Sequence, residues 1–170
     1  FLELENILDG VYGVGELSKT ILDKISSYGE LLSSYIFYEI TRFNNLDSEY
    51  IDARKIIFKK KSKGNSLIID FDKTSKKLEV VLNKKNSSFL IFPGFIASRH
   101  DKKTTTLGRG GSDFSASILA NIVNAKKLDI WTDVSGMYTA NPKIVKQAKP
   151  ISELSYEEAM ELSYFGAKVI

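Results

Sequence analysis

The sequence predicts an α/β fold, a three-layer α/β/α sandwich whose central sheet is mostly parallel. The continuous apolar run 88–95 is typical of a strand that is buried on both faces, and the segment 128–134 predicts a second buried strand. They alternate with segments of helical periodicity, of which 18–43 is the clearest. Buried strands that alternate with helices favour a parallel sheet covered on both sides. In such sheets ligands bind at the carboxyl ends of the strands.

The composition fits a single soluble globular domain. The chain has 170 residues, of which 43% are hydrophobic and 26% are charged. No apolar run approaches the roughly 18 residues that span a bilayer. The start, FLELENILDG, lacks the basic region and cleavage site of a signal peptide. The sequence begins without Met and in mid-pattern, so we expect it to be part of a longer protein.

Absent and rare residues exclude several kinds of site. There is no cysteine, which rules out disulfides, thiolate metal ligands and cysteine nucleophiles. The single histidine, His100, rules out a multi-histidine metal cluster. We interpret His100 as an incidental residue of an exposed polar loop, while a Ser-His-Asp triad stays open. The net charge of +3 permits an anionic ligand and does not demand nucleic acid.

The first predicted helix covers residues 18–43. Ser18 is a suitable N-cap, and Asn44 and Asn45 mark the end of the run. Gly29 interrupts the helix and destabilises it by about 1 kcal/mol relative to Ala. A kink or close packing would explain a glycine at this position. Glu30 beside it resembles a solvated surface carboxylate. The apolar residues at helical spacing are Ile21, Leu22, Ile25, Leu32, Ile36, Phe37 and Ile40.

The middle of the chain combines short strands with a second helix. We predict one strand within 50–58, a solvated lysine-rich loop at 58–65 and a helix over 70–82. The apolar run 88–95 then forms a strand that is buried on both faces. The residues of the helix that should face the core are Leu78, Val81 and Leu82.

The most informative segment is TTTLGRGGSDFSASILANIVN, residues 104–124. Gly108, Gly110 and Gly111 stand directly before a helix-periodic run. Glycine lets the backbone approach a ligand and take positive φ. The start of a helix offers unpaired N–H groups and the positive end of its dipole. This arrangement binds an anion, most often a phosphate.

Charged residues within this turn add to the signal. Arg109 lies between two glycines with little packing around it, and its guanidinium suits a carboxylate or a phosphate. The turn matches neither common nucleotide fingerprint. A Walker A loop needs Lys-Ser/Thr where Ser112 and Asp113 stand, and Asp113 also replaces the third glycine of G-x-G-x-x-G. A tight structural turn is the alternative interpretation.

The last third of the chain predicts a second buried strand and a capped helix. The strand, 128–134, ends near Asp133, whose carboxylate could bind ribose hydroxyls or a metal ion, or cap the following turn. Ser155 and Glu158 form a capping box for a helix that Gly166 ends.

Four strings carry a resemblance to a known family. In their order along the chain they resemble the amino-acid kinase domain of the aspartokinases, which has a carbamate kinase-like fold. The likeness extends upstream to 26–37. It implies that residues 1–170 are part of one amino-acid kinase domain whose N-terminal and C-terminal portions are missing. The strings are GFIAS (94–98), TTTLGRGGSDFSA (104–116), DIWTDVSGMYTANP (129–142) and ISELSYEEAMELSYFGAKV (151–169).

The resemblance implies transfer of the ATP γ-phosphoryl group to the side-chain carboxylate of L-aspartate, the first step of lysine, threonine and methionine biosynthesis. Glu30 matches the residue that contacts the substrate amino group, and Arg109 matches the one that grips a substrate carboxylate. Phe95 and Ser112 belong to the same pocket, and Asp113 matches the catalytic aspartate. The nucleotide-binding residues implied are Gly110, Gly111, Thr132, Asp133, Tyr138, Lys143 and Lys168.

The chemistry of the reaction agrees with these residue types. A carboxylate nucleophile is ionised at neutral pH, so the transfer needs no general base. The enzyme has only to position the reactants and to neutralise negative charge, which lysines, a helix N-terminus and Mg²⁺ can do. We therefore expect ATP and Mg²⁺ as cofactors, the ion being held mainly through the nucleotide phosphates and not by a metal site of the protein.

The sequence departs from the family pattern in places. Lys143 replaces a usual arginine, Asn141 an aspartate, Ala97 a glycine and Phe114 a tyrosine. The Lys-Phe-Gly-Gly-Thr-Ser segment that opens the family's domain is absent, and its lysine neutralises the phosphates. We therefore expect the 170-residue chain to be inactive by itself.

The expected partners are L-aspartate and ATP. We expect no nucleic acid, because no aromatic residues are interleaved with the lysine run, and no membrane. A cytoplasmic location and a homo-oligomeric full-length protein are also expected. Two alternatives stay open: a related kinase that acts on glutamate or acetylglutamate, and a non-catalytic regulatory or binding module of the same fold.

Overall fold

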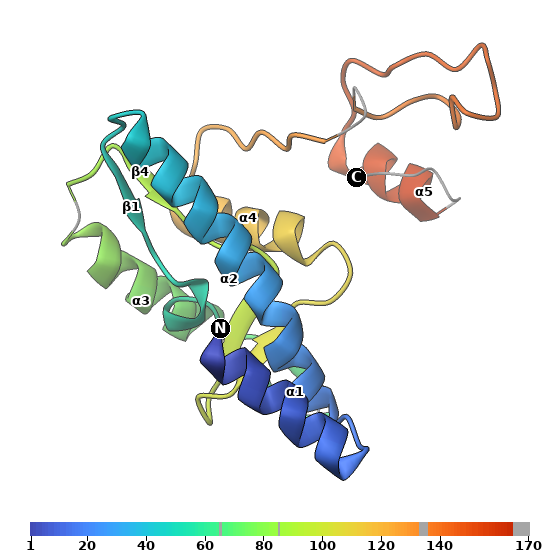
Figure 1. Ribbon diagram of the computed structural model, residues 1–170. Helices are drawn as coiled ribbons and strands as arrows, with labels where there is room; N and C mark the ends of the chain where they lie inside the picture. Colours follow the sequence, from blue (N-terminus) through green and yellow to red (C-terminus); the bar gives the residue numbers. More distant parts are fainter. Residues whose placement is uncertain (65, 85, 133–135, 165–170) are drawn as a thin grey trace. The chain divides into compact units, whose positions relative to one another are not determined.

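The computed structural model describes residues 1–64, 66–84, 86–132 and 136–164 (Figure 1). The chain forms two compact units, a first unit of residues 1–128 and a second unit of residues 129–170. Across the described ranges, no helix combines the length and the apolar character needed to cross a membrane.

The first unit begins with two helices, α1 (Leu2–Val14) and α2 (Lys19–Phe43). Figure 1 shows α1 running alongside the first part of α2. The Lys24 ammonium of α2 lies 2.6 Å from a carboxylate oxygen of Glu3 on α1. Helix α1 has no counterpart among the elements predicted from the sequence.

Helix α2 confirms its sequence prediction at both ends. The Ser18 hydroxyl accepts a hydrogen bond from the Ile21 amide at 3.3 Å, and Asn44 is the C-cap. A Cβ built at Gly29 would meet no described atom within 4 Å, so close packing does not account for this glycine.

The strands of the first unit form a pair and a four-stranded sheet. The pair joins β1 (Ser48–Tyr50) and β4 (Phe89–Ile91) in parallel. The larger sheet has the order β3-β2-β5-β6. Strands β2 and β5 run parallel, while β3 and β6 are antiparallel to their neighbours. The four strands of this larger sheet are β2 (Phe58–Lys61), β3 (Leu67–Ile69), β5 (Ile96–Arg99) and β6 (Thr104–Thr106).

The predicted α/β class is confirmed, but the described strands pair in both senses and do not form a mostly parallel sheet. Two short connections explain the difference. Strand β3 begins at Leu67 soon after β2 ends at Lys61, and β6 begins at Thr104 soon after β5 ends at Arg99. A parallel crossover needs a dozen or more residues, so each pair must be an antiparallel hairpin.

Helices cover the sheet and enclose one apolar core. Helix α2 packs against β6 and β1, α3 (Phe71–Leu82) against β2, and α4 (Gly111–Ile122) against β5. Successive residues Ile96 and Ala97 of β5 are both fully buried, which means that both faces of this strand are covered. The other buried members of the core are Ile51, Ala53, Ile56, Ile57, Ile69, Leu78 and Ile118.

Several predicted strand and loop boundaries are wrong. The segment 50–58 is not one strand, because a short 3₁₀ helix, Ala53–Lys55, separates β1 from β2. The lysine run predicted as a loop forms β2 itself, since its backbone pairs with strands on both sides. The strand predicted at 88–95 is shorter, because Pro93 lacks the N–H that continued pairing needs.

Helix α3 begins and ends as the sequence predicts, with Asp70 as its N-cap. Leu78 is buried and Val81 packs against the core, but Leu82 is exposed, so the predicted inward face holds for two of its three residues.

The second unit contains one described helix, α5 (Tyr156–Tyr164), and a β-bridge between Tyr138 and Pro150. The predicted capping box is confirmed at α5. The Ser155 amide donates to the Glu158 carboxylate at 2.8 Å, and the Glu158 amide donates to the Ser155 hydroxyl at 3.2 Å. Gly166, the predicted end of this helix, lies outside the described residues.

The buried strand predicted at 128–134 does not form within its described part, residues 128–132. Trp131 is 95% exposed. A strand of this composition is stabilised by covering its faces, and that burial is absent here.

His100 is exposed, as predicted, but it belongs to a charged cluster at the start of α3. Its Nε2 lies 2.8 Å from Oδ2 of Asp70, and the Lys60 ammonium lies 3.3 Å from Oδ1. The Lys73 amide also donates to Oδ1. Burial opposes ionisation of Asp70, but the hydrogen bonds from His100, Lys73 and Lys60 outweigh it and hold the pKa of this carboxyl below its ordinary value.

We predict that Asp70→Asn lowers the free energy of unfolding by about 1–3 kcal/mol at neutral pH, because it removes charge-assisted hydrogen bonds from a buried cap. The lowered pKa sets the pH dependence. The stabilisation is present above the ordinary value of 3.8 and is lost as the pH falls through the folded-state pKa.

Urea unfolding of wild type and Asp70→Asn at neutral and acid pH measures this difference. Asp72→Asn, an exposed carboxylate in the same first turn of α3, is the matched control and should change stability by less than about 1 kcal/mol. A gap between wild type and Asp70→Asn that is unchanged at pH about 3 would contradict the assignment.

Candidate functional site

A cavity of about 300 Å³ lies in the first unit at the glycine turn. Its walls come from α2, from the residues that follow β4 and from the turn that opens α4. Seven of the site residues predicted from the sequence line this one cavity. They are Glu30, Phe95, Arg109, Gly110, Gly111, Ser112 and Asp113, and Gly108 completes the lining.

The glycine turn has the backbone geometry that its sequence predicts. Gly108 and Gly110 have φ values of +83° and +67°, which favour glycine over residues with a side chain. The Gly111 amide donates to the Gly108 carbonyl at 3.0 Å, and α4 starts at Gly111. The turn therefore places the N-terminal end of α4, with its positive dipole end, at the cavity.

The segment before β5 lies unusually close to the start of α4. A Cβ at Gly94 would lie 2.9 Å from the Cα atom of Ser112, and a Cβ at Gly111 would lie 2.8 Å from Cδ2 of Phe95. Both positions therefore require glycine for steric reasons. Phe95 itself has a φ of +65°, a conformation that is rare for a bulky residue.

The threonine run before the turn is anchored on α2. Thr105 and Thr106 donate from their hydroxyls to the two carboxylate oxygens of Asp23, at 3.0 and 3.2 Å. The Lys59 ammonium donates to the Thr106 carbonyl at 3.0 Å, and burial lowers the pKa of this lysine. Helix α2 thus fixes β6, and the same helix carries Glu30 to the cavity.

Sequence reasoning missed Asp23 as a residue that supports the site. A signal for it existed, since Asp23 precedes Glu30 by seven positions, a spacing that returns to the same face of a helix. The lysine run, which the sequence predicts as a solvated loop, contains the partly buried Lys59, whose ammonium is bonded to the last residue of β6.

The cavity presents charges of both signs. Burial raises the pKa of Glu30 above its ordinary value. Arg109 is exposed, and in the ranges that the structure describes neither Glu30 nor Arg109 forms an ion pair. An acidic and a basic side chain left without partners in one small cavity suit a ligand that carries both an ammonium and a carboxylate.

A second cavity, of about 440 Å³, shares Glu30 with the first. It extends along α2 toward β4 and is lined by both polar and apolar side chains. The remaining residues that line it are Ser33, Ser34, Phe37, Leu90, Ile91, Phe92 and Gly94.

The predicted nucleotide-side residues after the first unit are placed only in part. Thr132 and Lys143 are exposed, and Tyr138 lies in the bridge to Pro150. Asp133 and Lys168 lie outside the described residues. These five residues belong to the second unit, and the seven residues of the cavity belong to the first.

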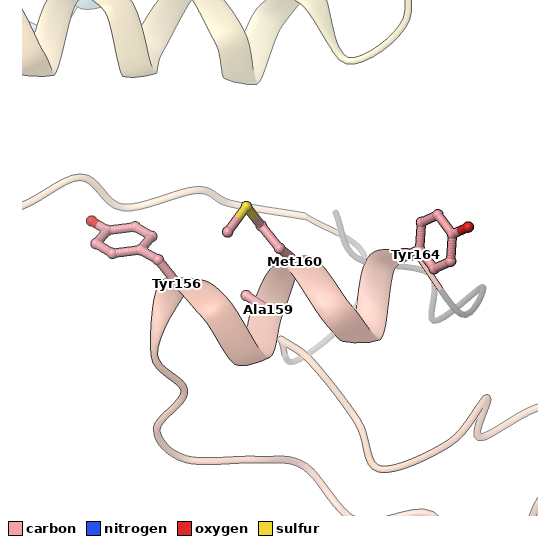
Figure 2. Close-up of a pocket in the computed structure, with 4 residues that line it drawn as sticks. All are labelled: Tyr156, Ala159, Met160 and Tyr164. Atoms are coloured by element: carbon pink, nitrogen blue, oxygen red, sulfur yellow. The ribbon is translucent and has the colours of Figure 1, made fainter.

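The second unit also has a shallow apolar hollow on α5. Tyr156, Met160 and Tyr164 follow one another at intervals of four along this helix, and Ala159 lies between them (Figure 2). In the parts of both units that the structure describes, no group of three or more His, Asp or Glu side chains is arranged to hold a metal ion.

Comparison with known proteins supports the resemblance seen in the four strings. Residues 5–170 match the amino acid kinase family. Lysine-sensitive aspartokinase 3 of Escherichia coli is 36% identical over 99% of this chain, and a bifunctional aspartokinase/homoserine dehydrogenase 2 of Arabidopsis thaliana is 36% identical over 98% of it. The chain spans 38% and 18% of the lengths of these two curated relatives.

The fold is also that of a solved aspartokinase. The crystal structure of E. coli aspartokinase III in complex with aspartate and ADP superposes with a TM-score of 0.83 and 35% identity. The superposition covers 99% of this chain and 39% of that structure. With the fold, four family strings and a match over residues 5–170 in agreement, the chain belongs to the amino acid kinase family.

Proposed function

We propose that this chain is part of an aspartate kinase, which transfers the γ-phosphoryl group of ATP to the side-chain carboxylate of L-aspartate. The observation that carries the proposal is the cavity that gathers Glu30, Phe95, Arg109, Ser112 and Asp113 at the glycine turn. A similar solved structure, aspartokinase III of E. coli, was determined with aspartate and ADP, which supports both ligands. We further propose that residues 1–170 belong to one amino acid kinase domain.

Aspartate has the charges that the cavity can pair. Glu30 is proposed to accept hydrogen bonds from the substrate ammonium, and Arg109 to donate two to a carboxylate through its guanidinium fork. Ser112 offers a hydroxyl and a backbone amide at the start of α4, and Phe95 supplies an apolar wall. This arrangement selects an α-amino acid that has a carboxylate side chain.

The reaction itself depends on positioning and on charge. The attacking carboxylate is already ionised at neutral pH, so no residue of the site has to remove a proton. The N–H groups of the turn and the dipole of α4 stabilise negative charge on the transferred phosphoryl group. Asp113, in the first turn of α4, is proposed to hold cationic groups in place around that phosphoryl group.

Gly110 and Gly111 of the turn are proposed as nucleotide-binding residues of the first unit. Mg²⁺ would enter with the nucleotide, bound mainly through its phosphates, and would neutralise part of their charge. Thr132, Asp133, Tyr138, Lys143 and Lys168 are the proposed residues of the second unit. A homo-oligomeric full-length protein and a cytoplasmic location stay predictions.

The full-length protein tests the function directly. ADP release in a coupled assay should depend on L-aspartate, and hydroxylamine should trap the acyl phosphate as a hydroxamate. Turnover with glutamate or acetylglutamate, and none with aspartate, would assign the site to a related kinase of the family. A protein that binds aspartate and ATP without turnover would instead be a binding module.

We predict that Arg109→Ala raises the KM for aspartate by about 10- to 100-fold, the equivalent of one charge-assisted interaction. Arg109→Lys keeps the charge but loses the fork, so its KM should lie between those of the wild type and Arg109→Ala. Arg42→Ala, an exposed arginine at the end of α2, is the control and should leave the KM unchanged. Equal KM values for Arg109→Ala and wild type would remove Arg109 from the substrate site.

We predict an acid limb in the pH profile of kcat/KM for aspartate that belongs to Glu30. The pKa of Glu30 lies above its ordinary value of 4.5, and only the ionised carboxylate attracts the substrate ammonium. The profile should therefore fall as the pH drops through this raised pKa. Glu30→Gln should show a lower and flatter profile over the same range. A limb of the same position and depth in Glu30→Gln would contradict the assignment.

A further inference from the structure

Phe95 has an unusual backbone that three hydrogen bonds hold in place. The Ile96 amide donates to the Gly94 carbonyl at 2.7 Å, which closes a γ-turn around Phe95 with a φ of +65°. The Leu107 amide donates to the Phe95 carbonyl at 2.7 Å, and the Phe95 amide donates to the Ser115 hydroxyl at 3.0 Å. Such a conformation is strained and persists only when its surroundings impose it.

Ser115 links this turn to the start of α4. Its hydroxyl donates a hydrogen bond to the Gly111 carbonyl at 2.8 Å and accepts one from the Phe95 amide. The hydroxyl is therefore used both as a donor and as an acceptor. The residue is only 3% exposed. Because a buried amide without a partner is unfavourable, loss of this hydroxyl would favour a Phe95 backbone that turns its amide elsewhere.

The position of the Phe95 ring depends on that backbone. The ring lies so close to Gly111 that a Cβ there would be 2.8 Å from Cδ2, and Phe95 lines the same cavity as Glu30 and Arg109. A change in the backbone at Phe95 therefore moves one wall of the cavity. Ser115 itself does not line the cavity, so it can act there only through Phe95 and Gly111.

We propose that Ser115 is a positioning residue of the aspartate pocket, whose hydroxyl holds Phe95 in its left-handed conformation and fixes the Phe95 ring against Gly111. The identity of the substrate rests on the function proposed above. The dependence of the Phe95 conformation on Ser115 is independent of that proposed function.

Three variants of the full-length protein test the proposal. Ser115→Ala removes the hydroxyl, and Ser115→Thr keeps it. Ser117→Ala is the matched control, because Ser117 lies on the same helix and its hydroxyl donates the same kind of bond, to the Asp113 carbonyl at 2.9 Å. Among the described residues, no hydrogen bond joins Ser117 to Phe95.

The expected result is an increase of about 10-fold in the KM for aspartate in Ser115→Ala, with the KM for ATP changed less than about twofold. Ser115→Thr should restore the KM for aspartate to within about threefold of the wild type, and Ser117→Ala should match the wild type. An equal rise in both KM values, or a rise that Ser115→Thr does not reverse, would mean a merely structural role and would overturn the proposal.

A crystal structure of Ser115→Ala separates this proposal from the proposed function. The structure should show Phe95 outside the left-handed region or its ring displaced from Gly111. If Phe95 keeps its conformation, the positioning role is refuted, whatever the substrate proves to be. If the wild-type protein does not use aspartate but Phe95 moves, the proposed function fails while the role of Ser115 stands.

Discussion

The close contact between the residues that follow β4 and the first turn of α4 determines the shape of the cavity. Gly94 and Gly111 let two backbones approach to a distance at which no side chain fits between them. Phe95 is thereby held against the turn that opens α4 and lines the cavity. An anion site built from backbone groups works only if those groups are fixed before the ligand arrives, and this contact supplies that rigidity.

Helix α2 connects the contact to the rest of the first unit. Asp23 holds Thr105 and Thr106 of the strand that leads into the turn, and Glu30 on the same helix reaches the cavity. Glu30 lies on α2 itself, whereas Arg109 lies in the turn after β6. Both are therefore connected to α2, because Asp23 of this helix anchors β6.

The sequence predicted those features that depend on local signals. The caps Ser18 and Asn44 of α2 and the box at Ser155 and Glu158 are determined by neighbouring residues and were found where expected. The pocket residues were identified through three segments that resemble the family, 26–37, 94–98 and 104–116. The β2–β3 and β5–β6 hairpins were not predicted, because the direction of a strand depends on its pairing partners, which a local sequence pattern does not reveal. The positive φ of Phe95 was also missed, since a phenylalanine gives no local indication of it and a distant hydroxyl imposes it.

The two glycines of the contact differ in how the sequence around them can evolve. A side chain at position 94 would meet the Cα atom of Ser112 at 2.9 Å, so no change of a neighbouring side chain could make room for it. At position 111 the nearest obstacle is Cδ2 of the Phe95 ring at 2.8 Å, but the Cβ atom of Leu107 at 3.1 Å and the Cα atom of Phe95 at 3.2 Å lie almost as close. A smaller residue at position 95 would therefore relieve only the closest of the contacts at position 111, whereas drift at position 94 requires the main chain itself to move.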